Sequence, residues 1–134
     1  MLNDTLKIAA AGMKAQGDRL RIIAENVANA DSTSTQPGGE PYRRKVVIFE
    51  NALNKELGVE TVRVAKRTYD MSDFRKKYDP THPAADEQGY VLFPNVSSII
   101  EMVDMRESRR AYEANINVVE VSKAMLTRTL ELLR

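Results

Sequence analysis

The chain has 134 residues, 20 of them basic and 19 acidic, a formal net charge of +1 and no cysteine. This length suits one ordinary domain. The balanced charge gives no general attraction to nucleic acid or an anionic membrane, and the lack of cysteine excludes thiol catalysis, thiolate metal sites and disulfides. We expect neither a secretory signal peptide nor a bilayer-spanning segment. The first residues lack a basic start with an apolar run, and no segment approaches about 18 to 20 apolar residues.

Residues 1–30 are predicted to form one long amphipathic helix. Apolar residues recur there in two interleaved seven-residue series, whose alternating steps of three and four place them along one line, as in a coiled coil. Six of them form what we call the N-terminal seam: Leu2, Leu6, Met13, Leu20, Ile23 and Val27. Gly12 and Gly17 each lower the helix propensity by up to about 1 kcal/mol, so this helix is not expected to be stable alone.

Residues 31–95 have a different character, with short apolar runs between turn-forming residues. Residues 45–49 and 59–64 are predicted to be strands, the second because it alternates in period two, and residues 89–93 to be a third short strand. Pro and Gly make loops of residues 36–41 and 79–83. Few strands and much loop indicate a small β-rich region that does not fold by itself.

Residues 96–134 are predicted to form a second, longer helix, since no Pro or Gly interrupts them. Ser98 and Glu101 have the spacing of a capping box at its start. Its main seven-residue series and an interleaved one supply the C-terminal seam: Met102, Met105, Tyr112, Ile116, Val119, Leu126, Leu130 and Leu133. Arg109 and Lys123 interrupt the interleaved series. A further apolar stripe lies on another face of the helix: Ala111, Ala114, Val118, Val121, Met125 and Leu132.

The expected fold is mainly α, with the long N- and C-terminal helices pairing as a coiled-coil-like hairpin joined by the short β-rich middle segment. A helix over residues 97–134 would be roughly 57 Å long, whereas a globule of this size is about 30 to 40 Å across. The N-terminal helix can bury only one of its stripes, so other chains must bury the rest. Residues 1–30, 31–95 and 96–134 are therefore expected to form one polymerising unit, not independent domains, with both seams serving assembly.

Residues with catalytic or metal-binding chemistry form no recognisable site in the sequence. His82 is the one histidine, and without cysteine a zinc site would need carboxylates almost alone. No serine stands in a Gly-x-Ser-x-Gly elbow, and the spacing of the middle carboxylates matches no calcium loop. These carboxylates are Asp70, Asp73, Asp79, Asp86 and Glu87. Catalysis by a carboxylate pair stays open, but nothing marks a cleft, and we expect no enzyme, metal or cofactor.

Two blocks of the sequence resemble the flagellar rod and hook axial proteins. Asn26-Val27-Ala28-Asn29 resembles the family's Asn-(Val/Leu/Ile)-Ala-Asn signature, which closes the N-terminal helix. Pro41-Tyr42-Arg43-Arg44 resembles the aromatic-basic element that follows it, here after an insertion at residues 32–40. The second block runs from Tyr78 through residues 101–115. The insertion, and the absence of a long extra domain after it, are similar to proximal-rod subunits.

The resemblance implies a structural subunit of the bacterial flagellar basal-body rod, which polymerises helically to transmit torque and to form a channel for protein export. The signature and aromatic-basic residues would then serve assembly, namely Asn26, Ala28, Asn29, Tyr42 and Arg43. The implied partners are further copies, rod subunits of the FlgB, FlgF and FlgG type, a rod-to-membrane-ring adaptor of the FliE type and the flagellar type III export gate. The chain would reach the periplasm-spanning rod without a cleaved signal, and it would neither bind nucleic acid nor insert into the membrane.

Two other classes of function remain open from the sequence. A soluble adaptor or chaperone that captures partner helices in a groove would also explain the excess of apolar helix surface. A small enzyme that uses the middle carboxylates is the third possibility.

Overall fold

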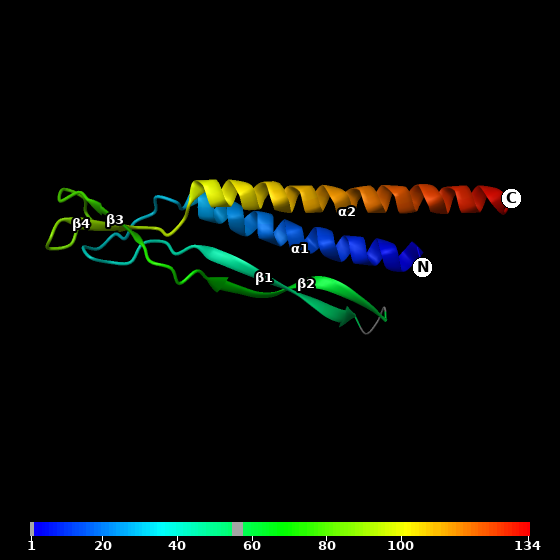
Figure 1. The fold of residues 1–134 in the computed structure, drawn as a ribbon, viewed down its shortest axis with the longest axis horizontal. Helices are drawn as coiled ribbons and strands as arrows, with labels where there is room; N and C mark the ends of the chain where they lie inside the picture. The colour runs from blue at the N-terminus through cyan, green and yellow to red at the C-terminus, as the bar shows by residue number, and fades with distance from the viewer. Residues whose placement is uncertain (1, 55–57) are drawn as a thin grey trace. The chain divides into compact units, whose positions relative to one another are not determined.

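The computed structural model describes residues 2–54 and 58–134, which form two long helices and two small antiparallel sheets (Figure 1). The elements follow the order α1 (Leu2–Ala28), β1 (Lys45–Asn54), β2 (Val59–Tyr69), β3 (Arg75–Tyr78), β4 (Tyr90–Phe93) and α2 (Ser98–Leu132). This confirms the predicted fold class of long terminal helices around a short β-rich middle. No described helix combines the length and the apolar character needed to cross a bilayer.

The strands of the middle segment are longer and more numerous than predicted. β1 and β2 pair with each other and extend beyond the predicted 45–49 and 59–64. β3 was not predicted, because Arg75-Lys76-Lys77-Tyr78 has no apolar alternation and all four residues are exposed. Its strand conformation comes from pairing with β4, not from its own sequence.

The described chain divides into two compact units. Unit one consists of Met1–Leu20, Val47–Lys66 and Arg106–Arg134, and unit two of Arg21–Val46 and Arg67–Met105. Each helix therefore contributes residues to both units.

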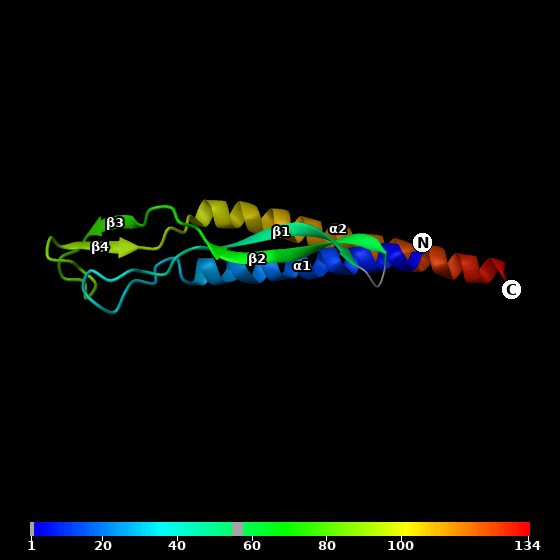
Figure 2. The same cartoon turned by 90° about the horizontal axis from the view of Figure 1, so that it is seen from below.

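In unit one, the N-terminal part of α1 packs antiparallel to α2. Arg19 pairs with Glu107 at 3.6 Å, and the side chain of Asn115 lies against Gly12. Figures 1 and 2 show the β1–β2 strands alongside the same part of α1. Within this sheet, Arg63 Nε of β2 donates to Glu50 Oε1 of β1 at 2.6 Å.

In unit two, the β3–β4 hairpin lies beyond the end of α1 and the start of α2 (Figures 1 and 2). The hairpin register pairs Arg75 with Phe93 and Tyr78 with Tyr90, and Val91 of β4 is fully buried. Gly89 enters β4 with a φ of 86°, and a Cβ there would lie 2.9 Å from the Tyr78 ring. This turn therefore needs glycine both for its left-handed backbone and for space.

The start of α2 differs from the predicted capping box. The backbone N–H of Glu101 donates to the carbonyl of Ser97 at 3.0 Å, so Ser98 is already a helical residue. The Glu101 carboxylate does not complete the box, because it accepts bonds from Arg44 and Asn26. The Glu101 carboxylate therefore makes tertiary contacts and does not cap its own helix.

Candidate assembly site

Asn26 stands at the centre of a polar network in unit two, near the end of α1. Its side chain is 1% exposed. Its Nδ2 donates to the carbonyl of Lys45 at 2.8 Å and to Glu101 Oε2 at 3.5 Å. Its Oδ1 accepts the Tyr42 hydroxyl at 2.8 Å and the backbone N–H of Lys45 at 2.9 Å. Both donors and both lone-pair positions are thus used, which only a carboxamide can do.

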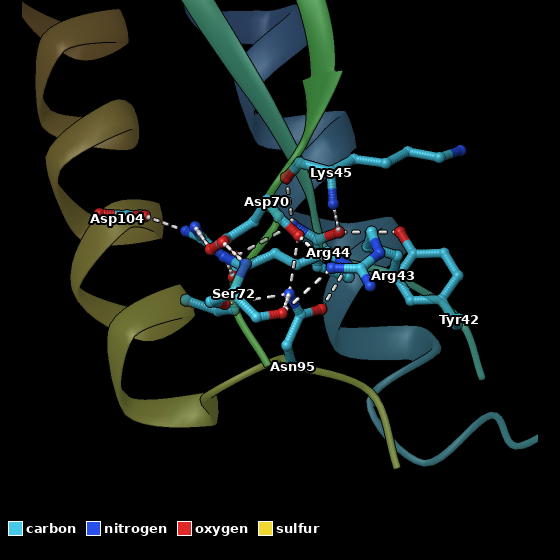
Figure 3. A network of polar contacts seen from close by, with 10 residues as sticks. Tyr42, Arg43, Arg44, Lys45, Asp70, Ser72, Asn95 and Asp104 are labelled. Carbon is cyan, nitrogen blue, oxygen red and sulfur yellow. Dashed lines mark hydrogen bonds and ion pairs between the residues drawn. The ribbon is translucent and has the colours of Figure 1, made fainter. Parts of the chain in front are cut away.

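Arg44 joins three carboxylates from different parts of unit two (Figure 3). Its Nε bonds Glu101 Oε1 at 2.5 Å, its Nη1 bonds Asp70 Oδ2 at 3.3 Å and its Nη2 bonds Asp104 Oδ2 at 3.1 Å. Glu101 is fully buried. Burial of Arg44 opposes its charge, but the hydrogen bond and the charge of Glu101 outweigh this and raise the pKa of Arg44. The guanidinium therefore fixes the start of β1 to α2.

Asn95 and Arg43 complete the network by holding the segment after β2. Asn95 Oδ1 accepts the backbone N–H of Arg44 at 2.8 Å, and its Nδ2 donates to the carbonyl of Asp70 at 2.9 Å. Arg43 Nη1 donates to the same carbonyl at 2.8 Å, and its guanidinium lies 4.1 Å from the centroid of the Phe74 ring. The hydrogen bonds of Asn95 and Arg43 appear together in Figure 3.

The carboxylate of Asp70 is held in its charged form. The backbone N–H of Ser72, which donates to Asp70 Oδ1 at 2.9 Å, lowers the pKa of Asp70, as do the Ser72 hydroxyl and Arg44, while burial opposes them. A hydrogen bond from Lys45 to Glu25 at 3.2 Å raises the pKa of Lys45 and so also favours the charged form of that side chain. These contacts favour the charged forms of Asp70, Arg44 and Lys45.

The two asparagines of the signature have different roles. Asn29 Nδ2 donates to the carbonyl of Glu25 at 2.9 Å, and Asn29 Oδ1 accepts the Ser32 hydroxyl at 3.0 Å. Both bonds are local and close the last turn of α1. Asn26 by contrast reaches residues 16 to 75 positions away in the sequence. Val27 and Ala28, between them, are exposed.

Most of the N-terminal seam is at least half-buried within the described chain. Ile23 is buried, Leu2, Leu6, Met13 and Leu20 are half-buried, and Val27 is exposed. The most deeply buried residues also include Ala15 and Ile22, which the seam does not contain. Ala15 and Ile22 are seven residues apart, and this spacing was the sequence signal that could have identified them.

The C-terminal seam is divided between half-buried and exposed positions. Met105, Tyr112, Ile116 and Val119 are half-buried. Four others are exposed, Leu126 by 43% and Leu133 by 78%, together with Met102 and Leu130. Apolar surface on α2 therefore remains uncovered within the described chain.

Counting apolar residues missed a polar series on α2, two of whose members, Glu101 and Asn115, contact α1. Glu101, Ser108 and Ser122 are buried and Asn115 is half-buried, so every seventh residue is polar. Asn115 Nδ2 donates to the carbonyl of Ala111 at 3.0 Å. Gly12 of α1 lies against the Asn115 side chain, and a Cβ at Gly12 would lie 2.7 Å from Asn115 Nδ2.

His82 has a structural contact in the loop between β3 and β4. Its Nδ1 accepts the backbone N–H of Ala84 at 3.0 Å, and its ring lies edge-on to Phe93, with centroids 6.3 Å apart. Within residues 2–54 and 58–134, His, Asp and Glu side chains form no group of three that could hold a metal ion.

Comparisons with known proteins give consistent matches over nearly the whole chain. Residues 6–34 match the family described as flagella basal body rod protein, and residues 87–132 match the flagellar basal body rod FlgEFG protein C-terminal family. The flagellar basal-body rod protein FlgC of Agrobacterium fabrum is 47% identical over 99% of this chain and 96% of its own. FlgC of Bacillus subtilis is 40% identical over 96% of this chain and 95% of its own. FlgC of Escherichia coli O6:H1 is 41% identical over 93% of this chain and 92% of its own.

Proposed function

The chain belongs to the FlgC family of flagellar basal-body rod proteins and is a structural subunit of the rod, and from that premise we propose how it assembles. Both seams and the signature region would pack against other subunits, so that residues 1–30, 31–95 and 96–134 act as one polymerisation unit. The resulting rod would transmit torque and enclose the channel through which flagellar proteins are exported.

The uncovered apolar surface of α2 carries this proposal. Beyond Ser122 every residue of the chain is exposed, and five large apolar side chains lie there: Met125, Leu126, Leu130, Leu132 and Leu133. At about 25 cal/mol per Å² of apolar area, leaving such a stripe in water is unfavourable, and packing it against neighbours is a favourable term in association. A helical polymer supplies those neighbours for every copy.

The partners are proposed on the same grounds. A rod subunit assembles with other rod components. The FlgB, FlgF and FlgG types and the FliE-type adaptor are the partners that we propose in particular. Location in the flagellum follows from the family. Export through the type III apparatus without a cleaved signal, and contact with its gate, complete the proposal. The family is one of structural proteins, so the adaptor and enzyme alternatives are not favoured.

Complementation of a motile strain that lacks its own FlgC tests the proposal. The chain should restore swimming and should appear in purified basal bodies on an immunoblot. A chain that is expressed and stable but absent from basal bodies would contradict the assembly proposed here.

A further inference from the structure

Unit two contains a cleft of about 470 Å³ at the start of α2, where the segments that follow α1 and β2 meet the helix. Its apolar lining includes Val96, which is buried, and Ile99, which is 76% exposed. Three charged side chains also line it, namely Asp31, Asp73 and Arg75. Apolar surface with charged side chains around it is the usual arrangement of a protein–protein contact, so the cleft fits a protein segment.

The charged side chains of the cleft leave one carboxylate without a cation. Arg75 lies 3.9 Å from Asp31, and its guanidinium also donates to the carbonyls of Pro94 and Ala30, at 3.1 and 3.2 Å. The side chain of Asp73 is exposed and forms no ion pair or hydrogen bond within residues 2–54 and 58–134. A segment that fills the cleft should therefore bring one cation together with apolar side chains.

The last turns of α2, which belong to unit one, carry this combination. Val121, Met125, Arg128 and Leu132 follow one another in steps of four, three and four, which places them along one line of the helix. We call these four residues the terminal stripe. All four are exposed, Val121 by 59%, Met125 by 53% and Leu132 by 86%. Arg128 forms no ion pair with any residue that the structure describes.

Arg128 restricts which surface can cover the terminal stripe. A guanidinium buried among apolar side chains is strongly unfavourable unless a carboxylate pairs with it. The covering surface must therefore place a carboxylate beside its apolar residues. Arginine suits such a pair, because its fork of N–H donors matches the two oxygens of a carboxylate. The cleft presents Asp73 and Ile99 in one surface.

We propose that the terminal stripe of one copy docks into the cleft of the next copy, where Arg128 pairs with Asp73 and Leu132 packs against Ile99. The contact joins two different surfaces of two copies. A contact of this kind repeats into an open helical array unless it closes into a ring. This inference rests on the proposed rod function and names one of its subunit contacts.

Disulfide trapping tests the contact, because the chain has no cysteine of its own. Ser97→Cys places a thiol in the cleft, and Thr129→Cys places one beside the terminal stripe. Both positions are exposed, and both variants keep every charged residue. When the two full-length variants are mixed under mild oxidation, a disulfide-linked dimer should form that neither variant forms alone.

Thr127→Cys is the matched control for Thr129→Cys. Both threonines are exposed, and each hydroxyl donates to the carbonyl four residues earlier, that of Lys123 at 3.0 Å and that of Met125 at 2.9 Å. Two steps along a helix turn a side chain by about 200°, so position 127 faces away from the terminal stripe. The control should give little or no dimer with Ser97→Cys. Equal dimer yields from the two threonine positions would overturn the proposal.

Charge reversal provides the second arm. Asp73→Lys in the cleft variant, or Arg128→Glu in the stripe variant, should lower the dimer yield roughly tenfold because like charges would then face each other. The two reversals together should restore the yield, and added salt should weaken the contact between copies that carry neither reversal. Yields that do not change with either reversal would overturn the contact, as would trapping of Ser97→Cys on a different rod subunit in isolated basal bodies.

The basal bodies also separate this inference from the proposed function. If the chain is present in them but the stripe and the cleft are never trapped together, the contact is wrong and the rod function stands. If the chain is absent from them, the rod function itself fails.

Discussion

The side chain of Asn26 and the backbone of Lys45 bond each other twice. Asn26 Nδ2 donates to the Lys45 carbonyl at 2.8 Å, and the Lys45 N–H donates to Asn26 Oδ1 at 2.9 Å. The carboxamide thus acts as a strand partner for the first residue of β1. One helix residue thereby sets where the strand begins, which explains why this position of the signature needs asparagine.

Asn26 and Asn29 should differ strongly on substitution. Asn26→Ala leaves the Lys45 N–H, its carbonyl and the Tyr42 hydroxyl without their bonds, at about 1–3 kcal/mol for each buried group left unpaired. Asn29→Ala removes only local bonds at a helix end and should cost about 1 kcal/mol or less. Urea unfolding of the purified chain measures both. Equal losses would contradict the separate roles.

Removal of the Arg44 guanidinium should be among the most damaging single changes in unit two. Arg44→Met leaves Glu101 buried without its partner, which typically costs about 3–5 kcal/mol. The control is Arg109→Met, which removes an exposed pair with Glu113 on α2 and should cost no more than about 0.5 kcal/mol. The urea midpoints of the two variants should separate clearly. A small loss in Arg44→Met would show that the cluster contributes little.

Acid should destabilise the chain in part through Asp70. Because its folded-state pKa is lowered, Asp70 contributes stability that is fully present above its unfolded pKa of about 3.9. That contribution is lost as the pH falls through the folded value. Asp70→Asn should therefore be less stable at neutral pH and should lose less on acidification. Urea midpoints measured between about pH 2 and 7 test this, and the exposed Asp73→Asn serves as the control.

Substitution by alanine should have different effects on the stability of the chain at the two glycines of α1. A Cβ at Gly17 meets nothing within 4 Å, so Gly17→Ala should raise the stability by up to about 1 kcal/mol through helix propensity. A Cβ at Gly12 would lie 2.7 Å from Asn115 Nδ2, so Gly12→Ala should cancel or reverse that gain. In an Asn115→Ala background the Gly12→Ala penalty should disappear. Thermal unfolding of the four variants checks the series, and a stabilised Gly12→Ala would argue against the close approach.

The exposed part of the C-terminal seam should matter for assembly and not for folding. Leu126 is 43% exposed in the described chain, so Leu126→Asp should leave the subunit stable. In the rod, the same carboxylate would be buried without a partner at a cost of several kcal/mol. We expect no swimming and no rod, while Glu131→Gln should be nearly silent. Swimming assays and basal-body preparations measure both, and normal motility of Leu126→Asp would remove the seam from the proposal.

Local patterns in the sequence were sufficient for the helices and for most of the strands. Apolar spacing in Leu6, Met13 and Leu20 identifies α1, and the lack of Pro or Gly after Pro94 identifies α2, because helix periodicity and chain breakers act over neighbouring residues. β3 was missed because Arg75-Lys76-Lys77-Tyr78 carries no pattern of its own. Its conformation depends on β4, which follows more than ten residues later.

The sequence by itself determined the two long helices, the β-rich middle and the excess of apolar surface on α2. Tertiary structure alone decided the partners of the polar residues. Glu101 has the spacing of a capping residue, yet it bonds Arg44 and Asn26, because a half-buried guanidinium stabilises a buried carboxylate more than a helix end does. The two asparagines of the signature look alike in sequence, yet only Asn26 faces the start of β1. Periodicity records which face of a helix is apolar, whereas the pairing of buried polar groups depends on which distant segments meet.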